Sequence, residues 1–469
     1  MNETNNTDNM KRELGLLDAT LLVAGGMIGS GIFIVSADVA RNVGSAGWML
    51  VIWLITGFMT ISAALSYGEL SGMYPKAGGQ YVYLREAYNS LIAFLFGWSF
   101  FAVIQTGTIA AVGVAFSKFF AYFIPQLGDD VILAKILGFN ISSAQLVSIA
   151  LIVFLTYVNT RGVKSGKIIQ TTFTSAKLVS LLGLVLFGLI LAKPEVWSAN
   201  WSNAFNIQRF SSPGVFNAYP SFYALAGGIA AAMVGTLFSS DSWNNVTFVA
   251  GEITNPKRNI GLALLLGTLT VTVLYILTNV MYTAVLPMND IATAAKDRVG
   301  IAAAESIFGT SGTAILALLV MVSTFGCNNG LILSGARVYY SMAQDGLFFK
   351  KAGELNKNAV PEFGLWIQCA FASLLCLSGR YGDLLDMISF VVVIFYVLTI
   401  IGIFILRVKQ PDLERPYKAL GYPVLPIIYI AMGITFCVLL IIYKPAYTWP
   451  GLIIVALGVP IYYFLMRKK

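Results

Sequence analysis

The feature that most constrains this chain is a series of long apolar segments that covers nearly all of its length. A helix that spans a bilayer needs about 20 predominantly apolar residues, and such segments recur from near the first residue to the last. We predict twelve spans, at residues 14–40, 46–72, 90–124, 142–158, 167–192, 223–252, 259–285, 311–342, 364–378, 384–406, 424–443 and 448–466. The sequence therefore predicts an all-α polytopic membrane protein.

Composition excludes several other classes of protein. Apolar residues make up 57% of the 469 residues and charged residues only 11%, whereas soluble domains have about 25% charged residues. Since the chain has no His, imidazole bases, His-ligated metals and Ser-His or Cys-His nucleophiles are excluded. The four Cys lie in apolar segments without a CxxC pair, so we expect free thiols, no metal and no cofactor. We also expect no enzymatic activity and no nucleic-acid partner; the expected partner is the lipid bilayer.

The distribution of positive charge predicts the orientation. An even number of spans places both termini on one side of the membrane, and most of the 30 Lys and Arg residues lie in segments on that side. Because cytoplasmic loops are enriched in Lys and Arg, we predict a protein of the cell membrane with both termini in the cytoplasm. Residues 1–13 are polar and lack the pattern of a signal peptide, so they are predicted to form a cytoplasmic tail.

Two of the predicted spans are interrupted at their centres. Residues 25–31 of the first span contain four glycines, and residues 239–245 of the sixth span are a polar insertion that includes Asp241. Glycine costs about 1 kcal/mol relative to alanine inside a helix, and a polar stretch at membrane depth must line a cavity or pack within protein. Two alternatives stay open: Gly25 and Gly29 could form a GxxxG packing face, and 239–245 could be a loop between two short segments.

The two interruptions occupy matching positions in two five-helix halves. Discontinuous helices in corresponding positions are typical of a transporter site near the membrane midplane. A half-helix N-terminus offers free N–H groups and the positive end of a dipole, which favour a carboxylate. A half-helix C-terminus offers free carbonyls, which favour an ammonium group. The pattern therefore predicts a site suited to an α-amino acid.

Four sequence motifs resemble a known family. Residues 29–33 (GSGIF) and 69–81 (ELSGMYPKAGGQY) are similar to motifs of the amino acid–polyamine–organocation (APC) superfamily. Residues 238–244 (FSSDSWN) and 325–330 (FGCNNG) resemble its L-type amino acid transporter (LAT) branch. The resemblance implies two inverted five-helix repeats, residues 14–192 and 223–406, with broken helices 1 and 6. Two further helices follow in residues 424–469, and the implied mechanism is alternating access.

The resemblance also implies the residues of an amino acid site. The N–H groups of Gly29, Ser30 and Gly31 would hold the carboxylate, and the carbonyls of Met27, Phe238 and Ser239 the ammonium, with Phe238 as an aromatic lid. The full implied set is Met27, Ile28, Gly29, Ser30, Gly31, Thr108, Val112, Phe238, Ser239 and Asp241.

Three features depart from that pattern. Relatives often have glycine where this chain has Ser242, so the second break could be shaped differently. Many have an aromatic residue where this chain has Ser240, and the more polar pocket favours small or polar neutral substrates. Residues 125–141 contain no Cys, so we expect no disulfide-linked heavy chain of the kind that pairs with eukaryotic LAT members.

One lysine lies inside a span. Lys177 is about ten residues into the fifth span, roughly 15 Å along a helix, and an intramembrane charge is a functional hypothesis by default. In the superfamily, a lysine at this place resembles one that replaces a sodium site, bridging span 1 and span 8 near Ser323 and Thr324. It would then act in gating or coupling, by titrating or as a permanently charged latch, or it could be satisfied by packing alone.

These observations predict a sodium-independent secondary transporter that exchanges neutral, small or polar L-amino acids. A proton-coupled symporter of the same fold is the closest alternative. A channel or an amino-acid-sensing receptor is a further alternative from another class. Residues Lys177, Ser323, Thr324 and Phe238 are the predicted gating and coupling residues.

Overall fold

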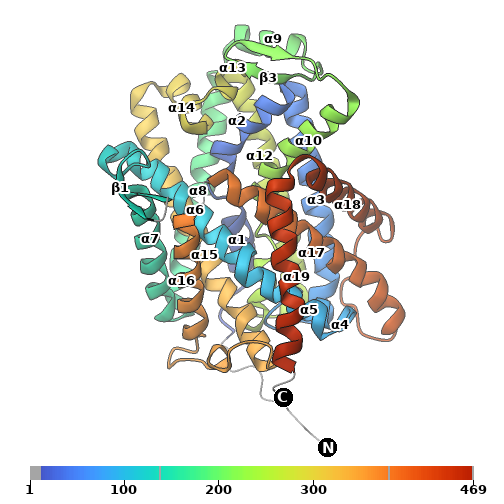
Figure 1. Ribbon diagram of the computed structural model, residues 1–469. Coiled ribbons are helices and arrows are strands. Elements are labelled where there is room, and N and C mark those ends of the chain that lie inside the picture. The colour runs from blue at the N-terminus through green and yellow to red at the C-terminus, as the bar shows by residue number, and fades with distance from the viewer. Residues whose placement is uncertain (1–11, 137–138, 379–380, 467–469) are drawn as a thin grey trace, which may run out of the picture.

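The computed structural model describes residues 12–136, 139–378 and 381–466, and most of them lie in a bundle of long helices (Figure 1). The helices of the first half are α1 (Leu16–Met27), α2 (Gly31–Val43), α3 (Ala46–Met73), α5 (Ser90–Ser99), the π-helical turn η1 (Phe100–Ile104), α6 (Gln105–Phe123), α7 (Ser143–Thr160) and α8 (Val163–Ile190). Helices α5, η1 and α6 together form one continuous span.

The second half is also built from long helices. It contains α10 (Phe222–Ser239), α11 (Asn245–Phe248), the 3-10 turn η3 (Ala250–Glu252), α12 (Pro256–Val285), α15 (Thr310–Gln344), α16 (Glu362–Ser378) and α17 (Tyr381–Lys409). The chain ends in α18 (Val424–Tyr443) and α19 (Pro445–Met466).

Shorter elements connect these helices. They are α4 (Gln80–Ala87), η2 (Pro125–Leu127), α9 (Pro194–Ser202), α13 (Met288–Ala292), η4 (Ala295–Asp297), α14 (Val299–Phe308) and η5 (Lys350–Gly353). Two antiparallel hairpins, β1 (Ile132–Ile136) with β2 (Phe139–Ser142) and β3 (Arg209–Ser212) with β4 (Val215–Asn217), lie in loops. Figure 1 shows α9, α13 and β3 at one end of the bundle and α4 near the other.

The predicted all-α polytopic fold is confirmed, but the count of twelve spans is not. Among the described residues, ten helices are long and apolar enough to cross a membrane, and the bent pair α1–α2 would supply an eleventh. The predicted ninth span corresponds to α16, which at 17 residues is shorter than these. Twelve spans, and the division into two inverted repeats, therefore stay predictions.

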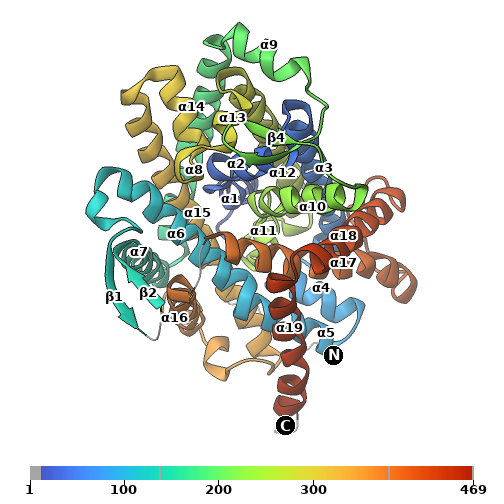
Figure 2. The same ribbon diagram turned by 45° about the horizontal axis from the view of Figure 1, so that its top comes forward.

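The two broken helices lie at the centre of the bundle, surrounded by the other helices (Figure 2). Helix α1 packs against α12, α8 and α15, and α2 packs against α10. Helices from the two halves interleave, because α3 packs on α12 and α6 packs on α15. The interruption in the sixth span leaves only the four-residue α11 and the turn η3 beyond it, so its second half is much shorter than a continuous helix would be.

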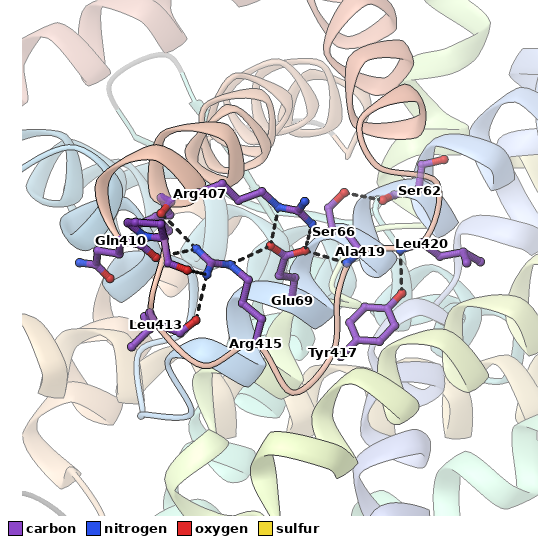
Figure 3. Close-up of polar contacts among 12 residues, drawn as sticks. Ser62, Ser66, Glu69, Arg407, Gln410, Leu413, Arg415, Tyr417, Ala419 and Leu420 are labelled. Carbon is purple, nitrogen blue, oxygen red and sulfur yellow. Dashed lines mark hydrogen bonds and ion pairs between the residues drawn. The ribbon is translucent and has the colours of Figure 1, made fainter.

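A buried carboxylate ties α3 to the end of α17 and to the segment that follows it (Figure 3). Glu69 is fully buried, and its two oxygens accept hydrogen bonds from Arg407 Nε and Nη2 at 3.0 and 2.7 Å. The backbone N–H of Ala419 donates to the same carboxylate at 2.7 Å, and Arg415 Nε lies 3.5 Å from it. Because a buried charge is costly unless it is paired and hydrogen-bonded, this cluster fixes the end of α3 against residues 407–419.

We predict that Glu69→Gln destabilises the protein, because the amide removes the negative charge that two arginines share. Loss of one partner of a buried ion pair costs about 3 to 5 kcal/mol, and unfolding of the purified protein in detergent measures it. The control is Lys257→Gln, which breaks the exposed pair between Lys257 and Glu414 of the same segment and should cost less than about 1 kcal/mol. Equal losses in the two variants would contradict the importance of the Glu69 cluster.

Candidate functional site

The first helix breaks at the glycine cluster. Helix α1 ends at Met27, α2 begins at Gly31, and the two axes differ by 41°. A Cβ atom at Gly31 would overlap the Ser239 side chain, and one at Gly26 would lie 3.1 Å from the Ser242 carbonyl oxygen. Gly26 and Gly31 therefore let the first broken helix approach the second.

The second break follows Ser239, as predicted. The chain leaves the helix through Ser240 and Asp241, whose N–H donates to the Phe238 carbonyl at 3.1 Å. Ser242 then adopts a φ of 68°, a left-handed conformation that favours glycine. Ser242, the position at which the family resemblance implied glycine, is thus the position where the backbone turns.

Donors from α8 and α15 converge on the carbonyls at the end of α1. The Lys177 ammonium is 2.5 Å from the Gly25 oxygen and 2.6 Å from the Ile28 oxygen. The Ser323 hydroxyl lies 3.0 Å from the same Ile28 oxygen, and the Cys327 thiol lies 3.1 Å from the Gly26 oxygen. Since the last carbonyls of a helix have no intrahelical donor and carry the negative end of its dipole, a buried cation is favoured there.

The predicted gating residues therefore divide into two groups. Lys177 and Ser323 meet at the break of α1, on the Ile28 carbonyl. Thr324 instead donates to Val320 and Met321 of its own helix. Cys327 was not among the predicted site residues, although it lies in the motif 325–330.

The carbonyls predicted to hold an ammonium group have protein donors in this structure. A single hydroxyl, that of Tyr275 on α12, lies 2.9 Å from the Met27 oxygen and 3.1 Å from the Ser239 oxygen. The Phe238 oxygen accepts from the N–H of Asp241. Sequence reasoning missed Tyr275, because one tyrosine within an apolar span carries no signal for a partner so distant in the chain.

The predicted carboxylate donors lie at the N-terminus of α2. The N–H of Gly29 donates to the Met27 carbonyl at 2.9 Å, so it is engaged within the break. Gly31 is the first residue of α2, and the first N–H groups of a helix have no intrahelical acceptor. Ser30 is buried. Because Gly31 is in contact with Ser239, the two breaks lie against each other with no room for a ligand between these residues.

Two cavities lie beside the second break. The first is lined by Met59, Thr60, Ala63, Leu237, Phe238, Ser240, Asp241, Trp243, Ile388, Ser389, Val392, Val393, Tyr396 and Tyr429. The second is lined by Gln80, Phe96, Phe100, Ile104, Gln105, Thr108, Asp241, Ser242, Asn244, Asn245, Val392, Phe395 and Tyr396. Phe238 thus faces the first cavity and Thr108 the second, whereas Val112 is buried and lines neither.

One carboxylate lines both cavities. Asp241 lines both, and its Oδ1 accepts a hydrogen bond of 2.5 Å from the Tyr396 hydroxyl. The Tyr396 ring packs beside Trp243 at a centroid distance of 5.2 Å. The second cavity is therefore lined by both polar side chains and aromatic rings.

The acidic and sulfur-containing side chains do not form a metal site in the part of the chain that the structure describes. The four cysteines Cys327, Cys369, Cys376 and Cys437 are free.

We predict that Gly31→Ala destabilises the protein, because its Cβ would overlap Ser239 and push α2 away from α10. Overpacking of this kind costs about 1 to 3 kcal/mol, which thermal unfolding in detergent detects. Gly183→Ala on α8 is the matched control, since its Cβ would meet nothing within 4 Å. Similar melting temperatures for the two variants would show that the breaks are not in close contact.

Comparison with known proteins identifies the family of this chain. The amino acid permease family model matches residues 14–465. The chain is 30% identical to the b(0,+)-type amino acid transporter 1 of Mus musculus over 98% of this chain and 88% of that protein. It is 29% identical to the serine/threonine exchanger SteT of Bacillus subtilis over 98% of both chains. It is also 29% identical to the human large neutral amino acids transporter small subunit 2, over 97% of this chain and 80% of that protein. The chain therefore belongs to the amino acid permease family of the APC superfamily, and it is an amino acid transporter rather than an enzyme.

Proposed function

We propose that this protein exchanges neutral, small or polar L-amino acids across the cell membrane by alternating access and without sodium. The observation that carries the proposal is the Lys177 ammonium, which lies within 2.6 Å of two carbonyls at the break of α1, next to the contact between Gly31 and Ser239. In this proposal both termini are cytoplasmic, and no disulfide-linked heavy chain is required.

Sodium independence follows from the charge of that lysine. Sodium would need oxygen ligands, and the oxygens at this place are the Gly25 and Ile28 carbonyls and the Ser323 hydroxyl. The Lys177 ammonium already occupies the two carbonyls and would repel a second cation at short range. A fixed positive charge therefore takes the place of a bound ion.

Substrate would bind where the two broken helices meet. In the proposed mode, the N–H groups of Gly29, Ser30 and Gly31 hold the carboxylate at the N-terminus of α2. The carbonyls of Met27, Phe238 and Ser239 hold the ammonium at the C-termini of α1 and α10. Since Gly31 and Ser239 are now in contact, the helices must separate to admit a substrate, which is the motion that alternating access requires.

The second cavity supports a preference for polar side chains. Gln80, Gln105, Thr108, Asn244 and Asn245 line it together with Asp241, and a site rich in hydrogen-bonding groups rejects ligands that leave them unpaired. Among the relatives, one is named a serine/threonine exchanger and another a transporter of large neutral amino acids. The polar lining favours substrates of the first kind, with serine and threonine as the leading candidates.

A proton-coupled symporter remains the second candidate. The observation that favours it is Asp241, whose carboxylate lines both cavities and accepts a hydrogen bond from Tyr396. Because the chain has no His, Lys177 or a carboxylate such as Asp241 would have to carry the proton.

We predict that proteoliposomes loaded with serine take up labelled serine at equal rates in sodium and in choline buffers. Empty liposomes should take up much less, and an imposed pH gradient should not replace the internal amino acid. Threonine and alanine outside should compete more strongly than leucine or lysine. Uptake into empty liposomes driven by a pH gradient would instead establish symport, and passive equilibration without counterflow would indicate a channel.

We predict that Lys177→Ala lowers the exchange rate about tenfold or more, which is equivalent to about 1.4 kcal/mol or more in the barrier to transport. The free energy of unfolding should fall by much less than this. The Ile28 carbonyl keeps the Ser323 hydroxyl as a donor, so the fold retains part of the network. Lys193→Ala, just beyond α8, removes the same charge from an exposed side chain bonded to Ser306 and should leave exchange unchanged. Full exchange activity of Lys177→Ala in proteoliposomes would exclude the proposed role of the lysine.

A further inference from the structure

The hydroxyl of Tyr275 lies between the ends of the two half-helices. Helix α1 ends at Met27 and α10 ends at Ser239, and the carbonyl oxygens of these two terminal residues lie 2.9 and 3.1 Å from the same hydroxyl. The tyrosine comes from a third helix, α12, and its side chain is buried. Its ring meets the Trp53 ring edge-to-face at 5.3 Å, which fixes where the hydroxyl can reach.

The chemistry of this place calls for a stronger donor than a hydroxyl. Two helix C-termini converge here, and each brings orphan carbonyls and the negative end of a dipole. A hydroxyl has one proton and can serve one of the two carbonyls at a time, whereas a primary ammonium has three. The Met27 oxygen also accepts the N–H of Gly29, so the Ser239 oxygen gains more from a second donor.

We propose that the Tyr275 hydroxyl stands in for the substrate's ammonium group in the empty carrier, and that substrate binding displaces it from the Met27 and Ser239 carbonyls. Tyr275 is then a positioning residue that holds the two breaks together when no substrate is bound. This inference rests on the proposed location of the ammonium group at these carbonyls, and not on the identity of the substrate's side chain.

Displacement has a thermodynamic consequence that a purely structural tyrosine would not have. In the native protein, the substrate ammonium replaces the Tyr275 hydroxyl as the donor to these carbonyls. Part of the binding energy is therefore spent on breaking the bonds of the tyrosine. Without the hydroxyl, the empty carrier has a less satisfied pair of carbonyls, and the incoming ammonium restores them. Removal of the hydroxyl should therefore destabilise the empty protein, leave the loaded protein nearly unchanged and tighten substrate binding.

The test is Tyr275→Phe in the full-length protein, compared with Tyr282→Phe as a matched control. Tyr282 lies two turns further along α12, and its hydroxyl reaches the Ile32 carbonyl at 3.2 Å, which already accepts a bond inside α2. Each variant is purified with and without an amino acid that stabilises the wild type, chosen from all twenty. Dissociation constants come from titration, and stability comes from the melting temperature with and without that amino acid.

We expect Tyr275→Phe to bind the amino acid about fivefold more tightly, the factor that corresponds to one hydrogen bond of about 1 kcal/mol. The melting temperature should fall only without the amino acid, so the shift on binding becomes larger than in the wild type. Tyr282→Phe should change neither quantity.

Unchanged or weaker binding by Tyr275→Phe would overturn the inference, as would an equal loss of stability with and without the amino acid. A variant that fails to fold even when the amino acid is present would also overturn it, because the ammonium should replace the missing donor. If the stabilising amino acid proves to be cationic, or if uptake follows a pH gradient, the proposed exchange of neutral substrates fails, and the comparison of Tyr275→Phe with wild type still decides this inference.

Discussion

The structure depends on hydrogen-bond donors for the backbone carbonyls that lose their helical partners at two buried helix breaks. Each unsatisfied group in hydrocarbon costs several kcal/mol, and the breaks of α1 and α10 free several carbonyls at the centre of the bundle. The donors come from three surrounding helices: Lys177 on α8, Ser323 and Cys327 on α15, and Tyr275 on α12. The surrounding helices are thus held around the breaks by hydrogen bonds as well as by apolar packing, which alone gives little specificity between helices in lipid.

The buried lysine illustrates why this solution is stable. A cation at membrane depth is expensive when it is isolated, and Lys177 is neutralised by helix geometry instead of by a carboxylate, since its contacts are the Gly25 and Ile28 carbonyls. The end of α1 supplies the partial negative charge that the ammonium needs, and the ammonium supplies the donors that the end of α1 needs. The buried ammonium and the unpaired carbonyls at the end of α1 therefore stabilise each other, and neither would be expected alone. The Glu69 cluster near the end of α3 follows the same rule with full charges, because its buried carboxylate is bonded by Arg407 and Ala419.

The sequence alone predicted the class of fold, the two breaks and the lysine, because each has a local signature. Long apolar runs, glycines within a span and a charge within a span are visible without any partner. The donor to Met27 and Ser239 was not predictable, because Tyr275 lies 248 residues from Met27 and tyrosines are common within spans. The second half of the sixth span was also predicted as a longer helix, whereas polar side chains after Ser242 bond to other elements, as Asn244 does with Gln80 at 3.0 Å. The carboxylate and ammonium sites, the role of Thr324 and the inverted repeats stay predictions.

The arrangement of donors also constrains how the carrier can move. Side chains of α8, α12 and α15 donate hydrogen bonds to the carbonyls of Met27, Ile28 and Ser239. A rigid displacement of α1 or α10 would therefore break several hydrogen bonds at once without replacing them. In the proposed binding mode, an amino acid would bring its own donors and acceptors to the same atoms and would lower the cost of separating the helices only while it is bound. In that mode, reorientation would be easy for the loaded carrier and costly for the empty one. That difference is what distinguishes an obligatory exchanger from a carrier that returns empty, and here it would arise from the backbone at the two breaks.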